Sequence, residues 1–99
     1  MIIQPILDLV AICAKKGIQN AILSPGSRCA PLTLAFARHP EIHSRTISDE
    51  RSAAFIALGM AQQLGQPVVL VCTSGSAALN YFPAISEAYF QQIPLLILT

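Results

Sequence analysis

The sequence predicts an α/β fold in which helices cover both faces of a parallel sheet, and three observations support this prediction. Helical and strand-like segments alternate along the 99 residues, and such alternation builds parallel sheets with helical crossovers. The run 68–72 is an unbroken series of β-prone apolar residues, which is typical of an inner strand covered on both faces. Polar or charged segments follow three of the strands, at the carboxyl edge where such sheets bind ligands.

The first half of the chain contains two helix–strand units. Residues 5–16 carry apolar side chains at helical spacing and stop at a glycine, so they predict a helix. The short apolar run 21–24 predicts a strand that ends in a Pro-Gly turn. Residues 31–38 predict a helix that begins with a proline. Residues 43–48 are polar for a buried strand, so we expect this strand at an edge of the sheet or in a half-covered place.

The second half repeats the same alternation. Asp49 is placed to cap a helix that extends to about residue 64. After the buried inner strand, residues 76–91 predict a helix, with a kink expected at Pro83. The chain ends on the apolar run 94–99, which predicts a fourth strand of the parallel sheet. A strand of this buried type with no helix after it indicates one truncated domain, in which residues 1–99 are the first part.

The composition indicates which partners the chain can have. Hydrophobic residues make up 54% and charged residues 11%, whereas a typical soluble domain has about 25% charged residues. We therefore expect part of the surface to be covered by something outside the chain. The net charge is +1 with scattered cations, which excludes a basic nucleic-acid-binding face. Four aromatic residues at helical spacing are predicted to lie in the core or in an interface: Tyr81, Phe82, Tyr89 and Phe90.

The cysteines and the first residues indicate the compartment. Cys13, Cys29 and Cys72 are odd in number and lack metal-binding spacing, so they are predicted to be buried thiols in a reducing environment. Lys15 and Lys16 follow the first apolar stretch instead of preceding it, unlike the basic residues of a signal peptide. No apolar run approaches the ~18 residues of a membrane span. We therefore expect a cytoplasmic protein with no membrane span.

Glu50 is the first candidate site residue. It lies in the first turn of a predicted helix at the carboxyl edge, and Ala53, Ala54 and Phe55 follow it. A carboxyl group with apolar neighbours can act as an acid or as a hydrogen-bond donor. An acidic residue in a first turn also complements the helix dipole without any further role.

Two other segments are candidates for binding an anion. Ser27 and Arg28 follow a Pro-Gly turn and precede a helix, so backbone amides and a guanidinium group could bind a carboxylate or a phosphate. The alternative is a turn in which the serine is an N-cap and the arginine faces solvent. The second segment comprises Thr73, Ser74, Gly75 and Ser76. It could form a phosphate nest or simply a tight turn.

Together these segments resemble the start of the 2-succinyl-5-enolpyruvyl-6-hydroxy-3-cyclohexene-1-carboxylate synthase family, thiamine-diphosphate enzymes of the menaquinone pathway. The Glu50 carboxylate and the Thr-Ser-Gly segment at 73–75 are shared with thiamine enzymes generally. The Ser-Pro-Gly-Ser-Arg segment at 24–28 is the feature that distinguishes this synthase family from the others. Cys29 stands where the family usually has serine, and Ser76 where it often has threonine. The matching motifs span nearly the whole chain: Ser24-Pro-Gly-Ser-Arg28, Ala30-Pro-Leu32, Asp49-Glu-Arg-Ser-Ala53, Cys72-Thr-Ser-Gly-Ser-Ala77 and Asn80-Tyr81-Phe82-Pro83.

The resemblance implies a pyrimidine-binding domain that holds thiamine diphosphate together with the diphosphate-binding domain of a partner subunit. A homo-oligomer, dimer or tetramer, is therefore implied. Glu50 matches the carboxylate that hydrogen-bonds the aminopyrimidine ring and promotes its imino tautomer. Ser27 and Arg28 match residues of the substrate site, where Arg28 would bind a carboxylate. The residues that match a loop near the cofactor are Thr73, Ser74, Gly75 and Ser76.

The implied activity is the decarboxylation of 2-oxoglutarate and the addition of its succinyl unit to isochorismate. The family's Mg²⁺ and diphosphate motif is absent from this sequence, so we expect no metal ligands here and no activity from these 99 residues alone. Two alternatives stay open. One is another thiamine-diphosphate enzyme, of the acetolactate-synthase type. The other is a non-catalytic module that binds phosphosugars at residues 73–76 and gives Glu50 no role.

Overall fold

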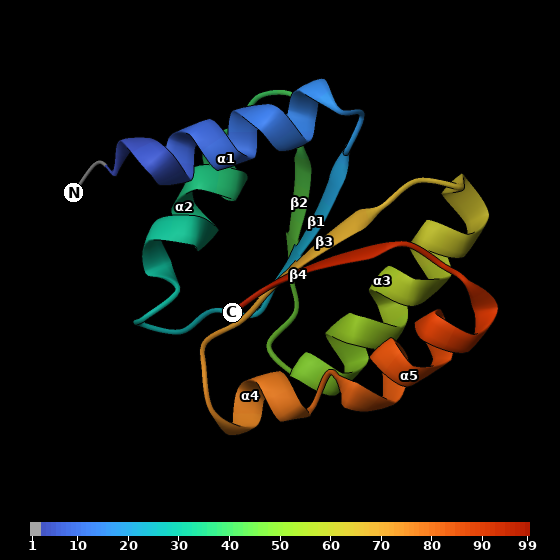
Figure 1. Ribbon diagram of the computed structural model, residues 1–99. Helices are drawn as coiled ribbons and strands as arrows, with labels where there is room; N and C mark the ends of the chain where they lie inside the picture. Colours follow the sequence, from blue (N-terminus) through green and yellow to red (C-terminus); the bar gives the residue numbers. More distant parts are fainter. Residues whose placement is uncertain (1–2) are drawn as a thin grey trace.

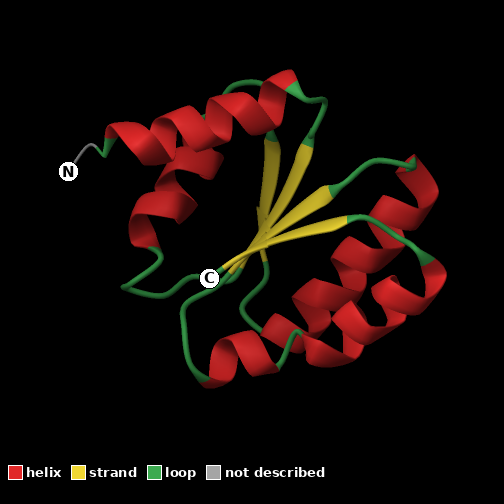
Figure 2. Cartoon of the chain, in the orientation of Figure 1, coloured by secondary structure: helices red, strands yellow, loops and turns green. Residues whose placement is uncertain are grey.

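The computed structural model describes residues 3–99, and its fold is a four-stranded parallel sheet with helices on both faces (Figure 1; Figure 2). The strand order is β2-β1-β3-β4, and every neighbouring pair is parallel. The predicted fold class is confirmed. The elements in chain order are α1 Gln4–Lys15, β1 Asn20–Leu23, α2 Ala30–Arg38, β2 His43–Thr46, α3 Glu50–Leu64, β3 Val68–Val71, α4 Ser76–Leu79, α5 Phe82–Gln91 and β4 Leu95–Leu98.

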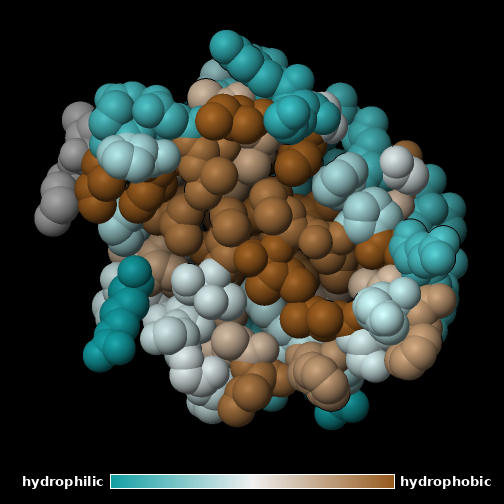
Figure 3. All heavy atoms as spheres, viewed as in Figure 1, coloured by the Kyte–Doolittle hydropathy of each residue, from teal (hydrophilic) through white to brown (hydrophobic). Residues whose placement is uncertain are grey.

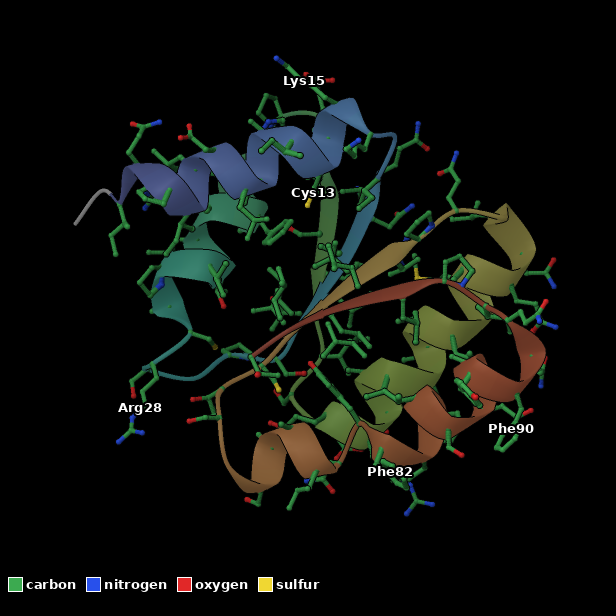
Figure 4. All side chains as sticks on the ribbon, viewed as in Figure 1. Cys13, Lys15, Arg28, Phe82 and Phe90 are labelled. Carbon is green, nitrogen blue, oxygen red and sulfur yellow. The ribbon has the colours of Figure 1, made fainter. Side chains whose placement is uncertain are left out.

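Two hydrophobic cores lie on opposite faces of the sheet because successive residues of a strand point to opposite sides. On one face, α1 and α2 pack against β1 and β3 through Cys13, Phe36 and other buried residues. On the other face, α3 and the α4–α5 segment pack against the same strands. Cys13 points from α1 toward the sheet, whereas Lys15 points to solvent (Figure 4). All three cysteines are buried free thiols, as predicted.

The ends of α3 follow the sequence signals. Asp49 is its N-cap, and the carboxylate oxygen Oδ2 accepts a hydrogen bond from the backbone N–H of Ser52 at 3.1 Å. Gly65 ends the helix in the left-handed conformation at φ 65°, which glycine adopts without steric cost. These two residues fix where α3 begins and ends, and therefore where Glu50 lies.

The prediction of one kinked helix over 76–91 is wrong. The segment contains two helices, α4 and α5, with Asn80 and Tyr81 between them. Pro83 lies in the first turn of α5, where its missing N–H is not needed and its fixed φ suits the start of a helix. The proline therefore starts a second helix instead of bending the first one.

The two edge strands differ in character. β2 is exposed at three of its four positions, which confirms the expectation of an edge strand. β4 is wholly apolar but only half-buried, and it pairs with β3 along one side only. Figure 3 shows hydrophobic side chains gathered at the centre of the face where β4 lies. No helix within residues 3–99 has both the length and the apolar character needed to cross a membrane.

Candidate active site

The three polar segments singled out in the sequence all follow strands at the carboxyl edge of the sheet. Residues 24–28 follow β1, residues 49–51 come shortly after β2, and residues 73–76 come shortly after β3. Because β2, β1 and β3 are neighbours in the sheet and run in parallel, the segments leave the sheet at the same edge. The predicted placement of the segments at one edge is therefore confirmed.

The first and third segments are in contact at Gly26. A Cβ atom on Gly26 would lie 3.0 Å from Thr73 Cβ and 3.2 Å from Thr73 Cγ2. The turn is also held by the buried Cys29, whose thiol donates to the carbonyl oxygen of Gly26 at 3.4 Å, while the Thr33 hydroxyl donates to Cys29 Sγ at 3.6 Å. This contact brings residues 24–28 against the loop that precedes α4.

Arg28 is exposed, and its side chain points away from the body of the molecule (Figure 4). It lines a small cavity of about 160 Å³ at this edge, where it meets the Thr73 segment. A guanidinium group in this place remains free to bind an anion from solvent. The cavity is lined by Arg28, Cys29, Leu32, Thr73, Ser74 and Thr99.

Ser27 is exposed and does not cap α2. The N-cap of α2 is Cys29, and its side chain makes no capping hydrogen bond. The alternative interpretation of Ser27 as an N-cap serine is therefore wrong, because Arg28 and Cys29 still lie between Ser27 and the first residue of α2. The Ser27 hydroxyl lies in the same turn as Arg28.

The Thr73 segment leads from β3 into the short helix α4. Gly75 has φ 85°, a conformation that a residue with a side chain rarely adopts. Ser74 and Ser76 are exposed, and Thr73 is half-buried. The carbonyl oxygen of Ser76 accepts a hydrogen bond from Asn80 Nδ2 at 2.9 Å. Of the two exposed serines, Ser74 lines the cavity at Arg28.

Glu50 is the first residue of α3 and is half-buried. Ala53 and Ala54, on the same turn, are fully buried against the sheet. Arg28 belongs to the loop before α2, and α2 and α3 cover opposite faces of the sheet. Glu50 and Arg28 therefore approach the carboxyl edge from opposite sides and are not brought into one cavity.

The N-cap beside Glu50 responds to pH. The hydrogen bond from the Ser52 hydroxyl, and then that from its backbone N–H, lower the pKa of Asp49. The stabilisation is therefore fully present above the ordinary carboxyl pKa, and it is lost as the pH falls through the folded pKa. We expect Asp49→Ala to accelerate amide exchange at Ser52 near neutral pH, with the difference from the wild type shrinking in acid. A difference that stays constant down to pH 2 would contradict this account.

Three buried polar groups to which the sequence interpretation assigned no role in the site lie behind Glu50. Ser24 Oγ donates to the carbonyl oxygen of Ile47 at 2.7 Å. Burial and then the neighbouring Cys72 thiol raise the pKa of Tyr81, and the Ser24 hydroxyl opposes this rise. Burial likewise raises the pKa of Cys72, to which the charge of Glu50 adds. The available signal was strand alternation, which points Ser24 to the same face as Ile22.

Within residues 3–99, no three His, Cys, Asp or Glu side chains come together as a possible metal site. His43 is exposed on β2 and His39 is half-buried, with Nδ1 accepting from the backbone N–H of Glu41 at 3.2 Å.

Of the four aromatic residues predicted to lie in the core or an interface, only Tyr81 is buried in this chain. Phe82, Tyr89 and Phe90 are exposed, and the two phenylalanines lie on the outer side of α5 (Figure 4).

Comparison with known proteins identifies the family of this chain. Residues 8–99 match the family described as thiamine pyrophosphate enzyme, N-terminal TPP binding domain. Proteins named 2-succinyl-5-enolpyruvyl-6-hydroxy-3-cyclohexene-1-carboxylate synthase from Cytophaga hutchinsonii and Christiangramia forsetii are 55% and 59% identical to it, over 97% and 93% of this chain. The chain spans only 17% and 16% of those relatives. The resemblance inferred from the motifs is confirmed.

A solved structure supports the fold. The benzoylformate decarboxylase from Polynucleobacter necessarius superimposes with a TM-score of 0.80 over 93% of this chain and 17% of that one, at 22% identity. At this identity the likeness concerns the fold alone. The family match over residues 8–99 and this likeness in fold agree with each other. The chain therefore belongs to the thiamine pyrophosphate enzyme family, as an N-terminal TPP binding domain.

Proposed function

We propose that a full-length protein carrying this chain decarboxylates 2-oxoglutarate and adds the succinyl unit to isochorismate, a step of menaquinone biosynthesis in the cytoplasm. The observation that carries the proposal is the position of Glu50, half-buried at the start of α3 and at the carboxyl edge of the sheet. The Ser-Pro-Gly-Ser-Arg turn at 24–28 and the names of the relatives support the choice of this synthase over an acetolactate-synthase type of enzyme.

The residues present fit the pyrimidine half of a thiamine diphosphate site. A single half-buried carboxylate beside buried hydroxyl and thiol groups suits a hydrogen bond to a neutral ring nitrogen, whereas a diphosphate with Mg²⁺ calls for several oxygen ligands. Glu50 would hold a proton at the ring nitrogen, and residues Thr73 to Ser76 would line the same side of the cofactor. When bound, thiamine diphosphate supplies the electron sink that stabilises the carbanion left by decarboxylation.

Substrate binding is assigned to the turn before α2. Arg28 would bind a substrate carboxylate with its planar guanidinium group, and the exposed hydroxyl of Ser27 would add a hydrogen bond. Both proposed substrates carry carboxylates, so an arginine beside the small cavity at Thr73 and Ser74 suits either one. The Mg²⁺ and diphosphate ligands are assigned to parts of the protein outside this chain.

The function can be tested by product analysis with the full-length protein. Purified enzyme with thiamine diphosphate and Mg²⁺ is given 2-oxoglutarate and isochorismate, and the product is identified by mass spectrometry. We expect carbon dioxide release together with the succinylated cyclohexene product. Condensation of pyruvate, with no reaction of 2-oxoglutarate, would contradict the proposal and would favour the acetolactate-synthase type.

The isolated 99 residues are expected to behave as an incomplete unit. The half-exposed apolar strand β4 and exposed side chains such as Phe82 and Phe90 leave apolar surface uncovered, and contiguous apolar surface drives association. We therefore expect self-association in analytical sedimentation. Calorimetric titration with thiamine diphosphate and Mg²⁺ should show no binding. A monomer that binds the cofactor tightly would contradict both expectations.

A further inference from the structure

Apart from tyrosine and the cysteine thiols, Ser24 is the one buried polar side chain within residues 3–99, with 1% of its surface exposed. Its backbone N–H donates to the carbonyl oxygen of Val71 at 2.9 Å, at the end of β3. Its hydroxyl donates to the carbonyl oxygen of Ile47 at 2.7 Å, in the link between β2 and α3. The backbone N–H of Ile47 in turn donates to the carbonyl oxygen of Leu23 at 2.9 Å. The carboxyl ends of three strands are therefore joined at Ser24.

This position does not require a hydroxyl for packing. Ser24 lies on the face where Ile22 and the α3 alanines form an apolar core. A hydroxyl buried in such surroundings is unfavourable unless it is hydrogen-bonded. Its bond to Ile47 holds the connection that leads, three residues later, to Glu50. The hydroxyl thus fixes the path of the chain into the first turn of α3.

Tyr81 is the second unusual group. Its side chain is fully buried, and its hydroxyl makes no hydrogen bond within residues 3–99. Ser24 and Cys72 are its polar neighbours. Ser24 uses its only proton on Ile47 and keeps free lone pairs, and the Cys72 thiol donates to the carbonyl oxygen of Thr73 at 3.2 Å. A tyrosine that remains protonated therefore faces two groups that can accept its proton in a hydrogen bond.

We propose that Ser24 and Tyr81 are positioning residues for Glu50. Ser24 holds the link before α3, and the Tyr81 hydroxyl, which lies beside Ser24, donates to it once the cofactor is bound. A chain of hydrogen bonds then runs from Tyr81, just after α4, through Ser24 to Ile47. It couples the loop at residues 73–76 to the first turn of α3. This inference rests on the proposed role of Glu50, but it does not depend on which substrates are used.

The sharpest variant is Tyr81→Phe, which removes one oxygen from a packed ring. In the full-length protein, we expect it to slow exchange of the thiamine diphosphate C2 proton about tenfold while substrate KM stays unchanged. With thiamine diphosphate bound, amide exchange over residues 47–53 should become faster, whereas without it, where the Tyr81 hydroxyl makes no hydrogen bond, exchange should match the wild type. Tyr89→Phe is the matched control, because Tyr89 is 77% exposed, and it should change neither measurement.

Ser24→Ala should give the same two effects, and Ser24→Cys, which retains a weak donor, should restore part of the C2-exchange rate. The double variant Ser24→Ala with Tyr81→Phe should be no slower than Ser24→Ala alone, because Tyr81 acts through Ser24. Ser86→Ala, in the half-buried part of α5, serves as the serine control. If Ser24→Ala does not fold, Tyr81→Phe and Ser24→Cys still decide the question.

Three results would overturn the inference. They are wild-type C2 exchange in Tyr81→Phe, unchanged amide exchange over residues 47–53 in the cofactor-bound variant, or independent, additive losses in the double variant. A higher melting temperature in Tyr81→Phe would also count against it, because that outcome means that the hydroxyl is merely buried without a partner. Failure of the synthase reaction in the wild type would instead refute the proposed function. The amide-exchange measurement requires cofactor but no substrate, so the two failures can be told apart.

Discussion

Glu50→Gln is expected to reduce the rate of C2-proton exchange of bound thiamine diphosphate by about 10²–10⁴-fold, the usual contribution of a general acid–base group. Glutamine keeps the size of the side chain but cannot hold a proton at the ring nitrogen. The effect on stability should be small, since an acidic residue in the first turn of a helix contributes about 0.3–1 kcal/mol. Proton exchange followed by nuclear magnetic resonance, together with a thermal melt of the full-length protein, checks both parts.

Glu41→Gln is the matched control for this experiment. Glu41 is exposed in the connection before β2, so its substitution should leave C2 exchange at the wild-type rate. If Glu50→Gln exchanges the proton as fast as the wild type, Glu50 serves only the helix dipole. A large loss of melting temperature in Glu50→Gln would instead mean that its carboxylate is mainly a structural group.

Arg28→Lys is expected to raise the KM for a carboxylate substrate roughly 10- to 150-fold. Lysine keeps the charge but loses the planar fork that forms two parallel hydrogen bonds to a carboxylate. A hydrogen bond to a charged group contributes about 1.5–3 kcal/mol, which corresponds to that range. Steady-state kinetics with each substrate varied in turn measures the effect, and calorimetry should show thiamine diphosphate affinity close to that of the wild type.

Arg38→Lys provides the comparison, because Arg38 is an exposed arginine in the last turn of α2. It should leave the KM of both substrates unchanged. Unchanged kinetics in Arg28→Lys would reduce Arg28 to a surface residue. A loss of cofactor affinity in Arg28→Lys would place it in the cofactor site rather than the substrate site.

Most of the fold could be predicted from the sequence because its signals are local. Asp49 lies before an apolar helical pattern and Gly65 after it, and both act through the backbone of their own helix. The polar character of 43–48 predicted an edge strand because an inner strand would have to bury those side chains. The placement of Glu50 at the carboxyl edge followed from the same reasoning, since parallel strands with helical crossovers leave the sheet at one edge.

The features that escaped prediction depend on tertiary contacts. Pro83 can kink a helix or begin one, and only the packing of α5 against α3 decides between these outcomes. Tyr81 belonged to a group of four aromatic residues that the sequence treats alike, although one is buried and three are exposed. The hydrogen bond from Ser24 joins residues 23 positions apart, so no local pattern could indicate it. The cavity beside Arg28 likewise depends on how closely two loops approach.

The close approach of Gly26 to Thr73 also constrains which amino acids the two positions can hold together. A methyl group at position 26 would lie 3.0 Å from Thr73 Cβ and 3.2 Å from its Cγ2, so an alanine there requires the Thr73 side chain to move aside by a few tenths of an ångström. Replacing Thr73 by serine removes the Cγ2 methyl but leaves the Cβ contact. Directed-evolution libraries that vary this edge should therefore randomise the two codons as a pair. Selection should favour glycine at 26 wherever 73 is β-branched, and it should admit alanine at 26 most readily where 73 is glycine.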